Sequence, residues 1–412
     1  MHIAVLAEPD SFHTRKWTSA LLALGLKVTV FSFSEYQLPH VPCVQVKPRL
    51  SWRGKLSYFS YLSSGDRLRE ALLAHRIDIV NPIDVTPFGV WARRAGLHPI
   101  MAVAMGADIL EYSPRDGEEV APERLWSRSL SGKATWKERL QYPLKQWLFR
   151  REVFKALHAA DMVSGDNRVL VDAMRQWFAV PAHKSYLNRW GVEPALFEMS
   201  EEQEQRIRQT YGLAPGQGLL LSPRGIKPIY QGDIILEAFA MLLRSGALGH
   251  TRVIMLSAGY AVPVAMDREA KALESAFPQF SLIREVIPRE DMCLLWNFTD
   301  VFVSAPVYDG YSNALSEGRY IGAIPVVNDT PATREVMQDG LHGRVVQPFT
   351  PDNLALSIKE IWESLDQWKA HSARQNREWV EEEAMLSVNM QEFVHKAHIL
   401  LEEFRAGAQK TL

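Results

Sequence analysis

Short apolar segments alternate with amphipathic ones along the first half of the chain. Five segments have the length and composition of buried strands: residues 2–7, 27–33, 77–81, 100–104 and 161–165. Between the first two, Trp17, Leu21 and Leu24 share one helical face, and Gly25 follows as a stop. Strands that alternate with helices in this way predict a parallel sheet covered on both faces.

The same pattern restarts after residue 195. Strands are predicted at residues 218–223, 252–258, 280–286, 301–306, 324–327 and 344–348, with helices such as 232–245 and 312–321 between them. We therefore predict two doubly wound α/β domains, residues 1–192 and 193–389. The C-terminal helix, from about residue 390 to 412, is expected to pack back on the first domain. Ligands bind beyond the carboxyl ends of such strands, so a cleft between two facing domains is the expected site.

Composition narrows the class of protein. The chain has 412 residues, enough for two cores, with 47% hydrophobic and 23% charged residues. A net charge of −2 gives no basis for nucleic-acid binding. Cys43 and Cys293 are too few for a disulfide framework or a cysteine-rich metal site. We expect a cytoplasmic protein without signal peptide or membrane span, because no apolar run reaches the ~20 residues that cross a bilayer.

The stretch "SAPVYDGYSNALSEGRYIG", from residue 304, joins a strand to a helix. Ser312 or Asn313 is a suitable N-cap, and the N–H groups at such a helix start favour phosphate. Glu317, about one turn further along, can accept hydrogen bonds from ribose hydroxyls, and Asp309 follows the strand. The alternative is structural, since Glu suits a first helical turn and Asp-Gly is a common turn.

Three further loops follow predicted strands. In "LLLSPRGIKPIYQGD" (219–233), Arg224 and Lys227 could neutralise a diphosphate, or be exposed cations without a role. In "AEPDSFHTRKW" (7–17), the polar residues are Ser11, His13 and Arg15, although a lone His here is more often a cap or surface residue. In "AVAMGADILEY" (102–112), Asp108 is a carboxylate for the cleft or an N-cap. No G-x-G-x-x-G follows a strand, and the motifs of P-loops, serine hydrolases and zinc proteases are missing, as is a metal-binding cluster.

Together these residues resemble the family 4 glycosyltransferases over nearly the whole chain. The likeness is strongest in residues 309–346, where the matching positions are Glu317, Gly322, Pro325, Glu335, Gly340 and Gly343. Segment 188–197, "NRWGVEPALF", resembles the family's domain junction. The chain departs from the family at Asp309 (usually Glu), Ser312 (usually Gly), Gln231 (usually Lys) and Met105 (usually His).

The resemblance implies the GT-B fold, two Rossmann-like domains facing a central cleft, and sugar transfer from a nucleoside diphosphate with retention of anomeric configuration. In that family's pattern Glu317 would bind the ribose, and Arg224 with Lys227 would stabilise the leaving phosphate. Asp309 would contact the sugar, and Asp108 and His13 would lie near the acceptor or the sugar. The donor-binding loop and helix start would comprise Gly310, Tyr311, Ser312, Asn313 and Ala314, and the acceptor-side loop Ser11, His13 and Arg15.

The resemblance also implies the partners. The donor would be a UDP- or GDP-sugar, used without metal or other cofactor, and the acceptor a glycan or lipid-linked glycan of bacterial surface polysaccharide synthesis. Two alternative functions are consistent with the sequence: a nucleotide-sugar epimerase or hydrolase on the same fold, and a nucleotide-sugar-binding protein without turnover.

Segment 133–155, "KATWKERLQYPLKQWLFRREVFK", is basic and aromatic. Such a segment can lie on the anionic inner face of a membrane. The alternative, that its aromatic side chains pack into the first domain while the cations face water, is favoured by the sequence, and Pro143 interrupts a single long amphipathic helix.

Overall fold

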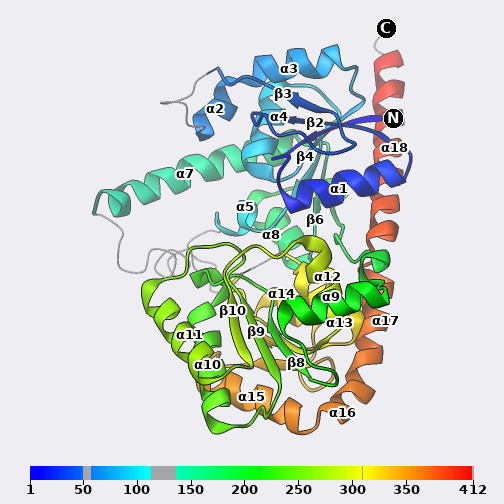
Figure 1. Cartoon of the computed structure of the whole chain (residues 1–412). Coiled ribbons are helices and arrows are strands. Elements are labelled where there is room, and N and C mark those ends of the chain that lie inside the picture. Colours follow the sequence, from blue (N-terminus) through cyan, green and yellow to red (C-terminus); the bar gives the residue numbers. More distant parts are fainter. Residues whose placement is uncertain (50–56, 113–135, 309, 411–412) are drawn as a thin grey trace. The chain divides into compact units, whose positions relative to one another are not determined.

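A computed structural model describes residues 1–49, 57–112, 136–308 and 310–410, with side chains described outside 136–146 and 408–410. The chain forms two compact units (Figure 1). The described residues up to Trp190 and from Leu386 onward form unit 1, and Gly191–Met385 form unit 2. The chain therefore passes from one unit to the other at residues 190–191 and again at 385–386.

Unit 1 is built on a parallel sheet. Its described strands are β1 His2–Leu6, β2 Lys27–Ser32, β3 Cys43–Gln45, β4 Ile79–Pro82, β5 Met101–Ala104, β6 Met162–Gly165 and β7 Ser185–Leu187. They run in the orders β3-β2-β1-β4 and β5-β6-β7, and parallel bridges Val80–Ile100 and Ile83–Val103 join the two groups. The strand order reverses between β1 and β4, which is the switch point where such sheets bind ligands.

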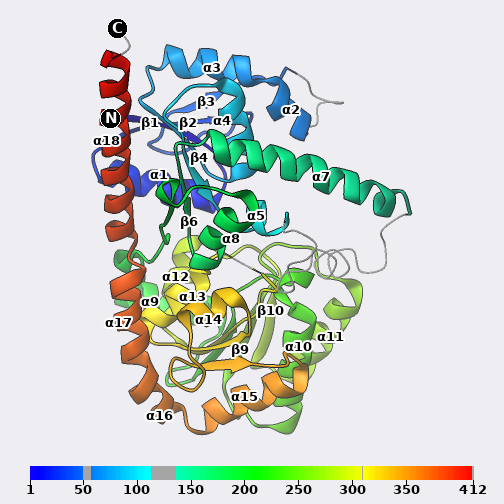
Figure 2. The same cartoon turned by 180° about the vertical axis from the view of Figure 1, so that it is seen from behind.

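Helices cover the sheet of unit 1. They are α1 Phe12–Ala23, α2 Tyr58–Ser63, α3 Gly65–Ala74, α4 Val90–Ala95, α5 Ala107–Leu110, α7 Trp136–Ala159, α8 Arg168–Phe178 and α18 Leu386–Lys410. The last helix, α18, packs against α1 (Figure 2), where the Phe393 ring lies 4.9 Å from that of Trp17. The Asn188 side chain also donates to the Asn389 carbonyl at 2.7 Å. The C-terminal segment thus completes the core of the unit that the N-terminus begins.

Unit 2 repeats the architecture. Its strands are β8 Leu219–Ser222, β9 Arg252–Leu256, β10 Phe280–Ile283, β11 Thr299–Ser304, β12 Ile324–Asn328 and β13 Arg344–Val346. All described pairs are parallel, in the order β10-β9-β8-β11-β12-β13. The reversal of order lies between β8 and β11, so the loops that follow these two strands should form the binding crevice of this unit.

Two apolar layers enclose the sheet of unit 2. Helices α10 Gly232–Ser245, α11 Val264–Ala276 and α15 Pro351–Glu363 cover one face. The other is covered by α9 Glu201–Tyr211, α12 Arg289–Trp296, α13 Asn313–Ile321, α14 Pro331–Val336 and α17 Arg374–Glu383. The short helix α16, Leu365–Trp368, follows α15.

Glycine at position 318 sets how closely α13 approaches the sheet. A Cβ atom there would lie 2.5 Å from the Phe302 ring of β11, closer than packed atoms come. Gly318 therefore allows α13 to lie directly on β11, which fixes the helix start beside the carboxyl ends of the strands.

Candidate functional site

The loops after β8 and β11 are hydrogen-bonded to each other at the switch point of unit 2. The Val307 N–H donates to the Ile229 carbonyl at 2.7 Å, and the Gln231 side chain donates to the Ala305 carbonyl at 3.0 Å. Gln231 is buried and has a left-handed backbone conformation, with φ of 52°. At the position where the resembled family has Lys, this chain uses an amide to join the two loops.

Arg224 reaches the start of α13. Its guanidinium donates to Ser312 Oγ at 3.0 Å and lies 4.5 Å from the centre of the Tyr230 ring. Ser312 is the N-cap of α13, and its Oγ accepts from the Leu315 N–H. A helix N-terminus carries partial positive charge and a guanidinium carries a full one, so together they favour an anionic group at this place. Asn313 and Ala314, predicted with Ser312 to meet phosphate, occupy the first turn of this helix.

Lys227 lies on an aromatic ring. Its Nζ is 3.7 Å from the centre of the Tyr260 ring, and no described carboxylate forms an ion pair with it. Gly225 makes this possible, because a Cβ atom there would come within 2.7 Å of the same ring. The loop after β8 therefore presents two cations, Arg224 and Lys227, each held against a tyrosine.

Glu317 is buried inside unit 2 and paired. Its side chain is 3% exposed, and the Arg289 guanidinium binds both of its carboxylate oxygens, with Nη1 to Oε2 at 2.9 Å and Nη2 to Oε1. Trp296 Nε1 also donates to Oε2, at 3.1 Å. The sequence placed Glu317 one turn into the helix but did not reveal Arg289 or Trp296, which lie on α12.

Of the other residues predicted for the donor loop, the structure describes Gly310 and Tyr311, whereas Asp309 lies outside the described residues. Gly310 and Tyr311 are buried, and the Tyr311 ring lies 5.7 Å from that of Trp379 within the core. Beside it, burial lowers the pKa of Arg319 to about 10. The Tyr311 side chain therefore packs the base of the loop, which leaves its backbone as the part that a ligand could contact.

The three polar residues predicted on the acceptor-side loop of unit 1 make separate contacts. Ser11 caps α1 by accepting from the His13 N–H at 3.2 Å. The His13 ring packs edge-on against Trp190, with the ring centres 5.3 Å apart. Arg15 is exposed and donates to the Tyr36 hydroxyl at 2.9 Å. The Ser11 side chain thus caps a helix, the His13 ring packs against Trp190, and the Arg15 side chain contacts Tyr36.

Asp108 is buried and ties two loops together. Its Oδ2 accepts from the Val85 N–H at 2.7 Å and its Oδ1 from the Met105 N–H at 2.9 Å. Burial raises the pKa of Asp108 to about 6, against the lowering effect of these backbone donors. Gly106, not Asp108, is the N-cap of α5. The carboxylate therefore holds the ends of β4 and β5 in place rather than capping a helix.

Two further carboxylates lie just beyond strands of unit 1. Asp84 follows β4 with φ of 78°, and burial, then the charge of Asp108, raise its pKa well above the usual range. Glu8 follows β1 and accepts from the hydroxyls of Ser32 at 3.3 Å and Tyr61 at 3.1 Å. Both were overlooked in the sequence, although each stands two residues beyond a strand, closer to the strand end than Asp108, which follows β5 by four residues.

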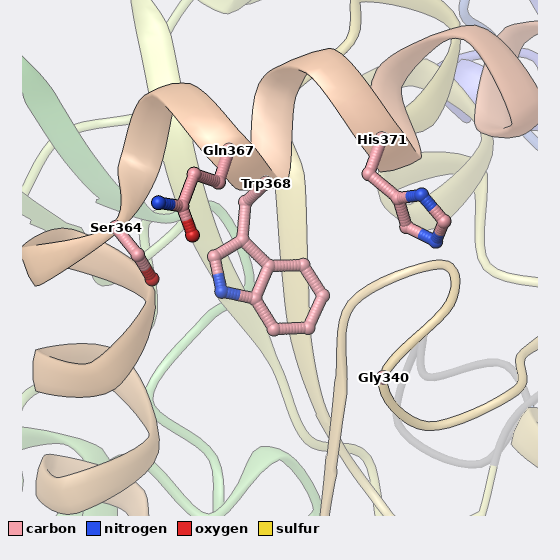
Figure 3. Close-up of a pocket in the computed structure, with 5 residues that line it drawn as sticks. All are labelled: Gly340, Ser364, Gln367, Trp368 and His371. Carbon is pink, nitrogen blue, oxygen red and sulfur yellow. The ribbon is translucent and has the colours of Figure 1, made fainter.

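A shallow pocket lies elsewhere in unit 2. Its lining residues are Gly340, Ser364, Gln367, Trp368 and His371 (Figure 3). Gly340 precedes β13, so the pocket is at the amino end of the parallel strands, whereas Arg224 and Ser312 follow the carboxyl ends. It is therefore separate from the switch-point site. Within the described part of the chain, no three His, Cys, Asp or Glu side chains gather as metal ligands would, and none of the helices is long and apolar enough to cross a membrane.

Comparison with known proteins identifies the architecture. A family model described as glycosyl transferase 4-like matches residues 2–133. Sucrose-phosphate synthase from Thermosynechococcus elongatus superposes with a TM-score of 0.71 at 13% identity, over 97% of this chain and 99% of that one. HepE of Anabaena, solved with UDP-glucose, gives 0.69 at 14% identity over 97% and 100%. WaaG, a glycosyltransferase of lipopolysaccharide biosynthesis, gives 0.67 at 16% identity over 97% and 99%. Curated protein sequences give no match.

The matches span both units. They confirm the GT-B fold with two Rossmann-like domains that the sequence predicted. With the family-model match in the first domain, they also confirm the resemblance to family 4-like glycosyltransferases.

Proposed function

We propose that this chain is a retaining glycosyltransferase that moves a sugar from a nucleoside-diphosphate sugar to a hydroxyl acceptor. The contact between Arg224 and the Ser312 cap carries the proposal, because it sets a guanidinium beside the positive end of α13 at the switch point. A diphosphate is the anion that suits such a place. HepE, which shares the fold, has been solved with UDP-glucose and with UDP.

The proposed reaction needs no protein nucleophile. The acceptor oxygen bonds to the anomeric carbon on the face that the nucleotide leaves, while the bond from that carbon to the phosphate oxygen breaks. The departing phosphate oxygen takes the acceptor's proton, so a glycoside and a nucleoside diphosphate are formed. Arg224, Lys227 and the N–H groups of the first turn of α13 would stabilise charge that grows on the leaving diphosphate. We propose that these groups serve in place of a metal ion.

We propose roles for the individual site residues from the pattern of the resembled family. Glu317 would accept a ribose hydroxyl, and Asp309 would contact the transferred sugar. In unit 1, Asp108 would support the acceptor side, with Ser11, His13 and Arg15 on the neighbouring loop. A UDP- or GDP-sugar is the proposed donor, and a glycan or lipid-linked glycan of a bacterial surface polysaccharide the proposed acceptor. The site of action would be the cytoplasm, at or near the inner face of the membrane.

Binding of nucleotides without metal tests the proposal first. We expect UDP or GDP, and its sugar conjugate, to raise the melting temperature in the presence of EDTA, since a ligand that binds only the folded state stabilises it. The control is the corresponding nucleoside, which lacks the diphosphate and should give no shift. If no nucleoside diphosphate shifts the melting temperature, with or without candidate acceptors, the proposal fails.

Product analysis then separates the two alternatives that share the fold. Incubation with the donor that binds should release nucleoside diphosphate only when an acceptor is present, and the new linkage should keep the donor's anomeric configuration. Release or rearrangement of the sugar without acceptor would indicate a hydrolase or an epimerase. Binding without turnover on any acceptor would indicate a nucleotide-sugar-binding protein.

We also propose peripheral contact with anionic membranes through α7. Within its described side chains, Trp147 and Phe154 are 57% and 43% exposed, and Arg151, between them, shares their helical face. Phe149 instead packs against Tyr58, with ring centres 4.5 Å apart. The alternative, in which the aromatic side chains pack into the domain, therefore fits Phe149 but neither Trp147 nor Phe154.

Sedimentation with vesicles tests this contact. At low salt the protein should pellet with vesicles that contain phosphatidylglycerol and stay in solution with neutral ones, because the attraction includes a screened electrostatic part. A Trp147→Ser, Phe154→Ser variant should bind less. The matched control is Val264→Ser, Val286→Ser, which removes two exposed apolar side chains from unit 2. Absence of sedimentation at every ionic strength would contradict the proposal.

A further inference from the structure

Arg289 occupies an unfavourable position in its own helix. It is the first residue of α12, directly after the Pro288 N-cap. The first turn of a helix favours acidic side chains and disfavours cations, and Glu290 and Asp291 follow in the same turn. The stability of α12 alone therefore does not explain an arginine at this position.

The partner of Arg289 explains its placement. The guanidinium binds both oxygens of Glu317, a planar bidentate geometry that lysine cannot reproduce. Glu317 is almost completely buried, whereas the Arg289 side chain is 29% exposed. A buried carboxylate is costly unless its charge is balanced and its oxygens are hydrogen-bonded, and Arg289 provides both. The pair also joins α12 to α13.

The Glu317 carboxylate keeps some capacity for a ligand. A carboxylate offers about four lone-pair positions. Arg289 uses two of them, one on each oxygen, and Trp296 uses a third, on Oε2. The position that is left is on Oε1, which suits one hydroxyl donor rather than two.

We infer that Arg289 is a positioning residue for recognition of the donor's ribose. It fixes the orientation of Glu317 so that Oε1 accepts from a single ribose hydroxyl, and the fork geometry, beyond the charge, is what achieves this. The inference rests on the proposed function, because it specifies how the same site distinguishes ribose from deoxyribose.

Calorimetric titration with paired nucleotides tests the inference. The probes are UDP and GDP, each beside its 2′-deoxy counterpart, and the proteins are the unaltered chain, Arg289→Met and Arg289→Lys. The unaltered chain should prefer the ribonucleotide by about 10- to 100-fold, the range of a hydrogen bond to a charged acceptor. In Arg289→Met the preference should fall to near unity, since Glu317 is no longer held. Arg289→Lys keeps the charge without the fork and should give an intermediate preference.

The matched control contacts the same helix, α12, from a neighbouring one. Arg206 of α9 forms an ion pair with Asp291 of α12 at 2.7 Å, on contacts that do not include Glu317. Arg206→Met should therefore keep the full preference for ribose, even if α12 is less stable. Circular dichroism and melting temperature establish that each variant is folded at the titration temperature.

The outcomes separate the inference from the function on which it rests. If the unaltered chain binds none of the nucleotides, the proposed function fails and the inference fails with it. If it binds them, and Arg289→Met weakens ribose and deoxyribose nucleotides equally, Arg289 only stabilises the fold and the inference alone is overturned. Should Arg289→Met be unfolded, an unchanged preference in Arg289→Lys would overturn it as well.

Discussion

Replacement of Glu317 by Gln is expected to reduce kcat/KM for the donor by about 100-fold or more. The substitution removes the negative charge that balances Arg289 and turns one of the two acceptor oxygens into a donor that faces the guanidinium. The ribose then loses a charged acceptor, and Arg289 is left without its counter-charge. Because Arg289 is partly exposed, the free energy of unfolding should fall by about 2–3 kcal/mol, less than for a fully buried pair.

Steady-state kinetics with the donor that binds, together with chemical denaturation, would measure both effects. Glu290→Gln is the matched control, since Glu290 stands on α12 next to Arg289 and its side chain is 67% exposed. Turnover and KM for the donor that match the unaltered protein would remove Glu317 from the donor site. A loss of stability with unchanged kinetics would assign the pair to folding alone.

Replacement of Arg224 by Ala is expected to lower kcat by about 10²- to 10³-fold, while affinity for the nucleoside diphosphate falls much less. The reason is that negative charge grows on the leaving diphosphate in the transition state, so a cation fixed at Ser312 contributes more there than in the ground state. Single-turnover rates and equilibrium binding of the nucleoside diphosphate would separate the two effects.

Arg244→Ala provides the control for this substitution, because Arg244 is an exposed arginine of unit 2 that pairs with Glu269 on the surface. Equal losses in rate and in affinity for Arg224→Ala would mean that Arg224 serves binding only. No loss of rate would move the phosphate-binding role to other residues of the two loops.

Most of the sheet architecture could be predicted because buried parallel strands are continuous apolar runs. Each of the eleven predicted segments overlaps a strand of the structure, from β1 at His2–Leu6 to β13 at Arg344–Val346. The strands β3 and β7 were missed. Each has three residues, and β3 is half-exposed or exposed throughout, so neither leaves an apolar run in the sequence.

The site was predictable only where chemistry follows a strand directly. Arg224 stands two residues after β8, and Ser312 caps the helix that follows β11; both were predicted from these positions, and their side chains are hydrogen-bonded. Arg289 was not identified, because it meets Glu317 through the packing of two helices, a relation that no local pattern encodes. The buried position of the Tyr311 ring likewise depends on Trp379, which is distant in the sequence.

The packing of α18 on unit 1 has a consequence for synthesis on the ribosome. Trp17 precedes unit 2 in the sequence, whereas its partner Phe393 follows unit 2. Unit 2 lies wholly between them in the sequence and can be completed first. Unit 1 therefore acquires its final form only after α18 has been made, and part of its apolar surface stays uncovered until then.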